Sequence, residues 1–273
     1  MRSAIARSYL FVPGNRPERF AKACASGADA VIIDLEDAVA PADKDAARAA
    51  AAEWLSPEHP VLLRINGADT QWFTEDLALC GLPGIAAVVL PKAEHADQIR
   101  AVAAVAPGIA VLPLIETAQG FWNAQGVAQT RPVQRLVFGS IDFQLDMGMD
   151  GDDLELFYFR SQLVLLSRIA GIQAPVDGVT AAIDDAAQIQ SETQRARRLG
   201  FRGKLCIHPK QVGIVNQCFM PSEADIAWAN KVLAAAEAAH GAAVALDGKM
   251  IDLPVIRKAQ EIADEAARRP APG

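Results

Sequence analysis

The residues of this sequence best suited to chemistry are charged side chains that end apolar runs. The run AVLPLI, residues 110–115, ends on Glu116, and the run RLVFGSI, residues 135–141, ends on Asp142. An ionised carboxylate taken out of water is costly unless a cation or hydrogen-bond donors compensate it. Each carboxylate therefore requires a compensating cation or hydrogen-bond donor. One cation can serve both only if the strands that precede them bring the two carboxylates together.

Eight short runs rich in Leu, Ile and Val recur along the chain. Segments with helical periodicity lie between most of them, at 44–54, 74–79, 95–105, 154–170 and 181–199. Alternation of strand and helix predicts parallel strands joined by right-handed crossovers. Near-continuous apolar strands are typical of a parallel sheet covered on both faces. The eight runs are SYLFVPG, AVIIDLED, PVLLRIN, AAVVLPK, AVLPLIET, RLVFGSID, APVDGV and KLCIHP.

Eight such units favour an α/β fold of the closed (β/α)8 TIM-barrel type over an open doubly wound sheet. The dinucleotide fingerprint GxGxxG is absent, and GFRGKL at 200–205 lacks the spacing and the hydroxyl residue of a phosphate-binding P-loop. We assign the barrel to residues 1–220 and a C-terminal helical extension, or lid, to residues 221–273.

The extension is predicted as a helix at 222–239, a loop at 241–250 and a helix at 254–268. Ser222 and Asp225 have the spacing of a capping interaction at the start of the first helix. Because this segment exceeds the eight barrel units, we expect it to cover something or to reach a neighbouring subunit.

Composition excludes several classes of protein. The net charge of −7 gives no basic footprint for nucleic acid. The four cysteines are scattered without a CxxC pair, which is typical of a reduced cytoplasmic protein. The apolar stretch near the start is broken by Pro13 and Gly14 and is too short for a signal or membrane segment. We therefore expect a cytoplasmic protein that binds neither nucleic acid nor membrane.

Glu116 and Asp142 form the leading candidate site. Chemistry in such barrels occurs at the C-terminal ends of the strands, and the fifth and sixth strands are neighbours, so both carboxylates can reach one point. Two carboxylates with waters and substrate oxygens suit Mg²⁺, whereas the lack of a His or Cys cluster argues against zinc. In the alternative interpretation, each carboxylate is an N-cap or an ion-pair partner of the following helix.

Arg64 is the one charge in its strand, and a fixed guanidinium there suits binding of a carboxylate or neutralisation of an enolate. A buried salt bridge to Glu36 or Asp37 is an alternative or simultaneous role. Glu36 and Asp37 could hydrogen-bond metal-bound water in a substrate site, while Asp34 is expected to face the barrel interior or a neighbouring loop.

Two further strand-end residues stay ambiguous. Lys92 would bind a substrate oxygen or pair with Glu116. His208 is interpreted as a structural strand-end histidine rather than a base. The sequence contains no GxSxG elbow or Cys–His signature of a covalent nucleophile.

Seven segments together resemble the citrate lyase β-subunit-like branch of the HpcH/HpaI aldolase superfamily, which includes malyl-CoA and citramalyl-CoA lyases. The resemblance runs in order over nearly the whole chain. The segments are LFVPGNRPERFAKACASGADAVIIDLEDAV, LLRIN, VVLPKAE, LPLIETAQG, VFGSIDF, GKLCIHPKQVGIVN and DGKMIDLPV.

The resemblance implies a (β/α)8 barrel with Mg²⁺, or alternatively Mn²⁺, held by Glu116 and Asp142, and with Arg64 in the substrate site. It implies cleavage or formation of a C–C bond in a 3-hydroxyacyl thioester, such as malyl-CoA, citramalyl-CoA or citryl-ACP. The aspartate of the MID motif, Asp252, would enter the active site of an adjacent subunit as an acid/base group, in a trimer or hexamer. For Asp252 alone, a helix N-cap is the alternative role.

Coenzyme A, as part of the substrate, needs basic groups for its phosphates near the barrel mouth. Arg16 and Lys22 are the leading candidates, with Arg19 and Lys44 beside them. Each could equally be a solvated residue at a helix start.

Three functions remain open at the level of sequence. The first is a Mg²⁺-dependent acyl-CoA lyase that yields acetyl-CoA and a 2-keto acid. The second is a thioesterase on the same scaffold. The third is a citrate lyase β-subunit that acts on citryl-ACP with partner subunits. The intact DGKMID motif favours a CoA enzyme, because the resemblance associates that motif with CoA lyases.

Overall fold

The computed structural model describes residues 6–238, 244–246 and 248–268. The chain forms two compact units, one of residues 6–216 and one that contains the described residues from 217 onward. The division falls within helix α10 (Pro209–Phe219). The domain boundary that we place after residue 220 stays a prediction.

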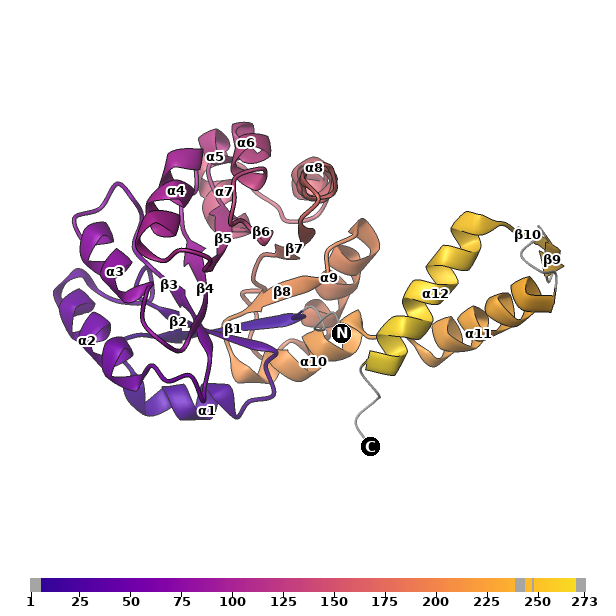
Figure 1. Ribbon diagram of the computed structural model, residues 1–273, viewed down its shortest axis with the longest axis horizontal. Coiled ribbons are helices and arrows are strands. Elements are labelled where there is room, and N and C mark those ends of the chain that lie inside the picture. Colours follow the sequence, from indigo (N-terminus) through magenta and orange to yellow (C-terminus); the bar gives the residue numbers. More distant parts are fainter. Residues whose placement is uncertain (1–5, 239–243, 247, 269–273) are drawn as a thin grey trace. The chain divides into compact units, whose positions relative to one another are not determined.

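The first unit is a closed barrel of eight parallel strands, which confirms the predicted fold (Figure 1). Each strand pairs with the next, and β8 closes the barrel on β1 through the pairs Ser8 with Lys204 and Leu10 with Cys206. The strands are β1 (Ser8–Pro13), β2 (Ala30–Asp34), β3 (Val61–Arg64), β4 (Ile85–Leu90), β5 (Ala110–Ile115), β6 (Arg135–Phe138), β7 (Gln173–Asp177) and β8 (Gly203–Cys206).

Helices lie between the strands and cover the outside of the barrel (Figure 1). Two of them, α2 and α8, have the predicted bounds, but α9 starts later than residue 181 because Asp185 caps it by accepting the N–H of Gln188. Among the described residues, no helix is both long enough and apolar enough to cross a membrane. The helices are α1 (Phe20–Cys24), α2 (Lys44–Trp54), α3 (Phe73–Leu79), α4 (Ala96–Val105), α5 (Ala118–Trp122), α6 (Ala124–Ala128), α7 (Ser140–Met147), α8 (Leu154–Ala170) and α9 (Ala186–Leu199).

Apolar side chains fill the barrel interior, with Ile32, Leu112 and Val137 among those that are almost fully buried. At the N-terminal end of the strands, Arg135 is fully buried and donates to the carbonyls of three residues and to the hydroxyl of Tyr9. This arginine satisfies backbone acceptors at the end of the barrel that faces away from the strand-end charges.

The second unit pairs two helices, α11 (Glu223–Ala238) and α12 (Leu253–Arg268), around a small apolar core. Ser222 and Asp225 exchange hydrogen bonds of 3.0 Å in each direction, which confirms the predicted capping interaction. The predicted loop at 241–250 is wrong in part, because β9 (Val244–Leu246) and β10 (Lys249–Ile251) form an antiparallel pair that buries Ile251. Residue 239 of the predicted helix and residues 241–243 and 247 of the predicted loop lie outside the described residues.

A buried ionic network joins β7, β8 and α8. Asp177, at the end of β7, accepts a 2.9 Å hydrogen bond from Arg160 Nε, and its other oxygen lies 3.6 Å from Lys204 Nζ. All three side chains are at most 1% exposed. Burial opposes ionisation of Asp177, but Lys204 and Arg160 outweigh it and hold the pKa of this carboxyl below its ordinary value.

Replacing Asp177 by alanine should destabilise the protein strongly, because Arg160 and Lys204 would stay buried without the carboxylate that lies between them, and Arg160 would keep only its pair with the partly exposed Asp152. We expect the free energy of unfolding to fall by roughly 3–5 kcal/mol, measured by urea denaturation. Arg100→Ala, which removes a surface ion pair with Asp97, should cost less than about 1 kcal/mol. A loss of similar size in both variants would contradict the importance of the buried network.

The contribution of Asp177 should also depend on pH. Because the folded-state pKa is lowered, the stabilisation is present above the unfolded value of about 4 and is lost as the pH falls through the folded value. The difference in unfolding free energy between wild type and Asp177→Asn should therefore shrink as the pH is lowered below about 4.

Candidate functional site

The strand ends converge on a cavity of about 390 Å³ at the C-terminal end of the barrel. Its apolar lining includes Phe11, Leu114 and Leu205. Its charged lining consists of Asp34, Asp37, Arg64, Glu116 and Asp142, which follow or end four of the strands, β2, β3, β5 and β6. The structure thus brings four of the predicted site residues, Arg64, Asp37, Glu116 and Asp142, into one pocket.

Arg64 is held rigidly at the edge of this pocket. Its Nε and Nη2 donate to the two carboxylate oxygens of Asp34 at 2.7 and 2.6 Å. Its Nη1 lies 2.8 Å from Glu36 Oε2, an ion pair without hydrogen-bond alignment. The Phe11 ring covers one face of the guanidinium at 4.6 Å. The predicted salt bridge to Glu36 is present, whereas the main partner is Asp34 rather than Asp37.

Asp34 is a site residue whose role the sequence analysis missed. It ends β2 directly beside Arg64 at the end of β3, and it also accepts the N–H groups of Glu36 and Ala38. This carboxylate therefore shapes the loop after β2 and orients the guanidinium. Adjacent strands that end on opposite charges were the signal that could have identified it.

Arg64 stays cationic and keeps donors for a ligand. Burial opposes its charged form, but the carboxylate of Asp34 outweighs burial and raises the pKa of Arg64. A guanidinium has five N–H groups. Asp34 accepts two of them, one from Nε and one from Nη2. The second N–H of Nη2 and the N–H groups of Nη1, which pairs with Glu36 only as an ion pair, are the donors that a ligand oxygen could use.

Glu36 and Asp37 differ in environment. Glu36 is buried, and burial, opposed by Arg64, raises the pKa of Glu36 to about 7. Asp37 is exposed at the pocket rim. Glu36 therefore contacts Arg64 without lining the pocket, and Asp37 is the one that reaches the cavity surface.

Glu116 follows β5 directly and is 2% exposed. It is not a helix cap, because the neighbouring Thr117 caps α5 by accepting the N–H of Gly120. A Cβ at Gly139 would lie 2.6 Å from Glu116 Oε2, so only glycine leaves room for this carboxylate. Burial, then repulsion from Glu36, raises the pKa of Glu116 to about 8.

Lys92 contacts Glu116 through its backbone and not through its ammonium group. Its N–H donates to Glu116 Oε1 at 2.7 Å, while its Nζ lies 4.0 Å from Glu36 Oε1. The predicted pairing of the Lys92 ammonium with Glu116 is therefore wrong. The φ of Lys92 is +45°, a region that costs a non-glycine residue roughly 1–3 kcal/mol, and this conformation aims the N–H at the carboxylate.

Asp142 lies in the first turn of α7 and not at the end of a strand. β6 ends at Phe138, and the helix starts at Ser140, so the predicted extension of the sixth strand to Asp142 is wrong. The carboxylate still lines the pocket, where burial, followed by repulsion from Asp37, raises the pKa of Asp142.

The Glu116 and Asp142 carboxylates fit a divalent cation. Neither forms a salt bridge within the described residues. Burial and the nearby carboxylates raise the pKa of each. No group of three His, Cys, Asp or Glu side chains in the described chain has the arrangement of a metal cage. Two carboxylate donors with waters or ligand oxygens match the preference of Mg²⁺ for oxygen and for a partly protein-built shell.

The basic residues predicted for coenzyme A lie outside this pocket. Arg16 pairs with Glu18 at 2.6 Å on the surface, and Lys22 is exposed on α1. Lys44 is buried and donates to the carbonyls of Leu35 and Glu36 and to Asn66. Because these three bonds use all donors of its ammonium group, the predicted phosphate contact of Lys44 is wrong.

Two other predicted residues have structural contacts. His208 Nδ1 accepts the N–H of Lys210 at the start of α10, as expected for a structural histidine. Asp252 belongs to the second unit, where it is exposed and its Oδ1 accepts the N–H of Val255 at 3.3 Å. Asp252 is therefore an N-cap of α12, and its catalytic role stays a prediction.

Comparison with known proteins places the chain among citrate lyase-like proteins. A model of the HpcH/HpaI aldolase/citrate lyase family matches residues 7–209. The citrate lyase subunit beta-like protein of Deinococcus radiodurans is 37% identical over 284 residues, covering 97% of this chain and 98% of that protein. The (3S)-malyl-CoA thioesterase of Cereibacter sphaeroides is 36% identical over 271 residues, covering 96% and 95%.

A solved structure of a citrate lyase-like protein has the same fold as this chain. The crystal structure of CitE from Mycobacterium tuberculosis, in complex with magnesium, acetoacetate and coenzyme A, matches with a TM-score of 0.86 and 35% identity. The match covers 98% of this chain and 100% of that one. Because the family match spans every strand of the barrel, the chain belongs to the HpcH/HpaI aldolase/citrate lyase family, as its sequence motifs predict.

Proposed function

We propose that this protein is a Mg²⁺-dependent carbon–carbon lyase. It cleaves, or forms, a 3-hydroxyacyl-CoA such as malyl-CoA or citramalyl-CoA, with acetyl-CoA and a 2-keto acid as the other reactants. One observation carries the proposal: Arg64, with free N–H donors, shares a pocket with Glu116 and Asp142, which lack a neutralising partner. The similarity to CitE, whose crystal contains magnesium and coenzyme A, supports it.

Glu116 and Asp142 would hold the metal ion, with Mn²⁺ as an alternative to Mg²⁺. When bound, the ion lowers the pKa of a substrate hydroxyl and polarises a keto oxygen as a Lewis acid. Lys92 contributes by fixing Glu116 through its backbone N–H. Asp37, at the rim, and Glu36, beside Arg64, would hydrogen-bond water near the ion, and the Lys92 ammonium would contact a substrate oxygen.

Arg64 would stabilise the enolate that forms when the C–C bond breaks. Asp34 and Glu36 partly neutralise its charge, so its contribution comes from N–H groups aimed at the developing oxyanion rather than from net charge. Donors that are already in position need no reorganisation during the reaction, which is the main source of electrostatic catalysis. The pair with Asp34 provides this positioning.

Asp252 would protonate the carbon of that enolate, or remove a methyl proton in the condensation direction. We propose that it comes from a neighbouring subunit of a homotrimer or homohexamer. Arg16 and Lys22 would contact the phosphates of coenzyme A. A cytoplasmic location also stays a prediction.

A thioesterase is the second candidate, and the similarity to a (3S)-malyl-CoA thioesterase favours it. In that reaction, water attacks the thioester carbonyl, and the C–C bond stays intact. A citrate lyase β-subunit acting on citryl-ACP with partner subunits is the third. The products separate the three functions.

The first experiment is a product assay with Mg²⁺ and malyl-, citramalyl- and 3-hydroxy-3-methylglutaryl-CoA. We expect acetyl-CoA and an equal amount of 2-keto acid from malyl- or citramalyl-CoA, and no turnover by Asp142→Ala. Asp150→Asn, which changes an exposed carboxylate after α7, is the matched control and should keep full activity. Free CoA with intact hydroxy acid would establish the thioesterase instead, and inactivity on all three would point to an ACP-bound substrate.

Glu116→Gln should stabilise the metal-free protein and abolish its response to Mg²⁺. Glutamine keeps the acceptor for Lys92 but removes a buried charge that the fold disfavours, so the unfolding midpoint at pH 8 should rise by about 2–4 °C. Between about pH 4.5 and 8 the folded wild type binds more protons at Glu116 than the unfolded chain, so its stability falls as pH rises.

Thermal unfolding with and without Mg²⁺ checks this expectation. Wild type should gain stability on adding Mg²⁺, whereas Glu116→Gln should not. The pH slope of the variant should be smaller but not zero, because Glu36 also has a raised pKa. Equal Mg²⁺ stabilisation of both proteins would remove Glu116 from the metal site.

The shared-site role of Asp252 can be tested by mixing two inactive variants. In an assembly formed from equal amounts of Asp252→Asn and Glu116→Gln, about one quarter of the sites combine an intact barrel with an intact neighbouring extension. Activity should therefore return towards about one quarter of the wild-type value. Native mass spectrometry confirms exchange, and continued inactivity of mixed assemblies would place Asp252 outside the neighbour's site.

A further inference from the structure

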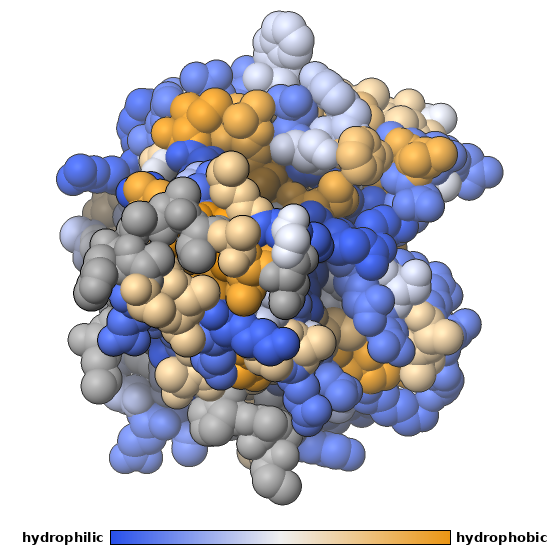
Figure 2. Space-filling model, turned by 90° about the vertical axis from the view of Figure 1, so that its right-hand side faces the viewer, coloured by the Kyte–Doolittle hydropathy of each residue, from blue (hydrophilic) through white to orange (hydrophobic). Residues whose placement is uncertain are grey.

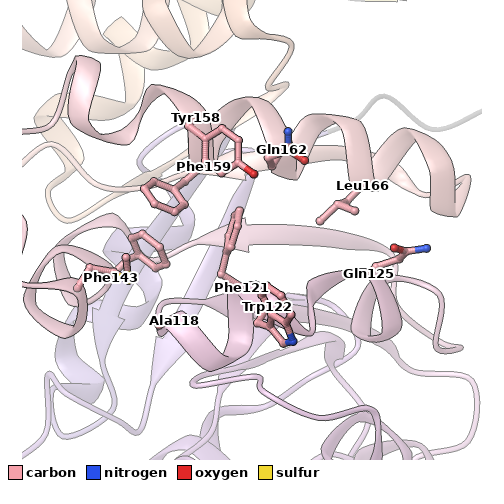
Figure 3. Close-up of a pocket in the computed structure, with 10 residues that line it drawn as sticks. Ala118, Phe121, Trp122, Gln125, Phe143, Tyr158, Phe159, Gln162 and Leu166 are labelled. Carbon is pink, nitrogen blue, oxygen red and sulfur yellow. The ribbon is translucent and has the colours of Figure 1, made fainter.

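A second cavity, of about 420 Å³, lies between α8 and the helices α5, α6 and α7, outside the pocket that contains Arg64. Figure 3 shows the rings of Phe121, Phe143 and Phe159 among its lining residues. None of the described residues that line it carries a charge. This cavity therefore offers no group for acid–base or ion chemistry. A buried cation near Arg64, Lys44, has more bearing on the reaction.

Lys44 lies where a cation is unfavourable on two counts. Figure 2 shows hydrophilic residues spread over much of the surface, whereas Lys44 is only 6% exposed. It is also the first residue of α2, at the helix end that disfavours positive charge. Burial lowers the pKa of Lys44, although the carboxylates of Glu36 and Asp34 oppose this shift. Residues that break local rules in this way are expected at functional sites.

The ammonium group of Lys44 joins the loops that follow β2 and β3. It donates to the carbonyls of Leu35 and Glu36, each at 2.8 Å, and to Asn66 Oδ1 at 2.7 Å. Leu35 and Glu36 come directly after β2, and Asn66 comes two residues after the end of β3. Because an ammonium group has three donors, all of them are used to hold these two loops together.

Both loops contact or adjoin Arg64. The N–H of Leu35 donates to the carbonyl of Arg64 at 2.9 Å. Glu36 Oε2 lies 2.8 Å from Arg64 Nη1. Asn66 is two residues beyond Arg64 in the chain. Lys44 is therefore connected to Arg64 by three routes, through Leu35, through Glu36 and through Asn66.

Asn66 is also held from a second side. Its N–H and its amide nitrogen donate to Oδ2 of the buried Asp76 at 2.8 and 2.6 Å. The other oxygen of Asp76 accepts from Arg48 Nε at 2.8 Å. Arg48 lies one turn after Lys44 on α2. Helix α2 thus fixes Asn66 directly through Lys44 and indirectly through Arg48.

We propose that Lys44 is a positioning residue of the active site, which locks the loops after β2 and β3 so that Glu36 and the N–H donors of Arg64 keep their places during the reaction. The inference rests on the role in the reaction that is proposed above for Arg64. Glu116 is held by other elements, the N–H of Lys92 and the space at Gly139. Loss of the Lys44 ammonium should therefore disturb Arg64 and leave the metal ligands in place.

Kinetics of Lys44→Met test this role, because methionine nearly keeps the side-chain length and removes the donors. Both kcat and kcat/KM should fall about 10- to 100-fold, with KM and the Mg²⁺ requirement unchanged, since Arg64 acts on the transition state. Arg135→Met is the matched control. It also removes a buried cation from backbone carbonyls, but at the opposite end of the barrel, and it should keep the wild-type kcat per folded molecule.

Circular dichroism at the assay temperature gives the folded fraction of each variant. A wild-type kcat in folded Lys44→Met would overturn the proposal. Equal losses of kcat per folded molecule in Lys44→Met and Arg135→Met would also overturn it, because they would indicate a general structural effect.

Amide hydrogen exchange tests the same inference without turnover. In Lys44→Met, peptides that cover residues 34–39 and 64–67 should exchange faster than in wild type, whereas residues 113–118 should keep the wild-type rate. Unchanged exchange at 34–39, or a uniform increase over the whole chain, would contradict a positioning role. A wild type that forms no acetyl-CoA would contradict the proposed function alone, since the exchange result does not depend on the reaction.

Lys44→Gln serves as a second variant if Lys44→Met does not fold. Its amide keeps two N–H donors, so fewer buried acceptors lose their partner. The fall in kcat and the faster exchange at 34–39 should have the same direction and a smaller size. Wild-type kcat together with wild-type exchange in Lys44→Gln would overturn the proposal.

Discussion

The ion pair between Asp34 and Arg64 is the interaction on which the site depends. It joins the ends of β2 and β3, with both carboxylate oxygens bound to one guanidinium at 2.6 and 2.7 Å. Asp34 also orders the loop that carries Glu36. Without this carboxylate, Arg64 would lose both of its hydrogen bonds to Asp34 and keep only the ion pair with Glu36 and the contact with Phe11. Glu36 would lose the hydrogen bond from its own N–H to Asp34.

The two sides of the pocket differ in how their charges are compensated. Arg64 has carboxylate partners, whereas Glu116 and Asp142 form no salt bridge within the described residues. Arg64 forms ion pairs with Asp34 and Glu36, and both carboxylate oxygens of Asp34 hold its guanidinium in place. The pKa values of Glu116 and Asp142 are raised by burial and by other carboxylates. The fold holds this disfavoured charge through fixed elements, including the N–H of Lys92 and the space that Gly139 leaves. An arrangement that is costly for the protein alone is suited to binding a cation.

Much of the fold and part of the site could be predicted from residues alone. The eight apolar runs correspond to the eight strands because each strand of a covered parallel sheet must be apolar on both faces. Glu116 and Arg64 stand out because a charge directly after such a run is unusual. Two predictions about the site were wrong. Lys92 contacts Glu116 through its backbone N–H rather than through its ammonium group, and Asp142 lies in the first turn of a helix rather than at the end of a strand. Neither distinction is visible in residue type.

The sequence by itself determined the barrel, the charges at its strand ends and the family, because hydrophobic periodicity and motif order are local properties of the chain. Only the tertiary structure decided which charges compensate each other. Asp34 rather than Asp37 holds Arg64, and the ammonium group of Lys44 donates to two backbone carbonyls and to the side-chain amide oxygen of Asn66. Partner choice depends on distances of a few ångströms between segments far apart in sequence, and these distances exist only once the barrel has closed.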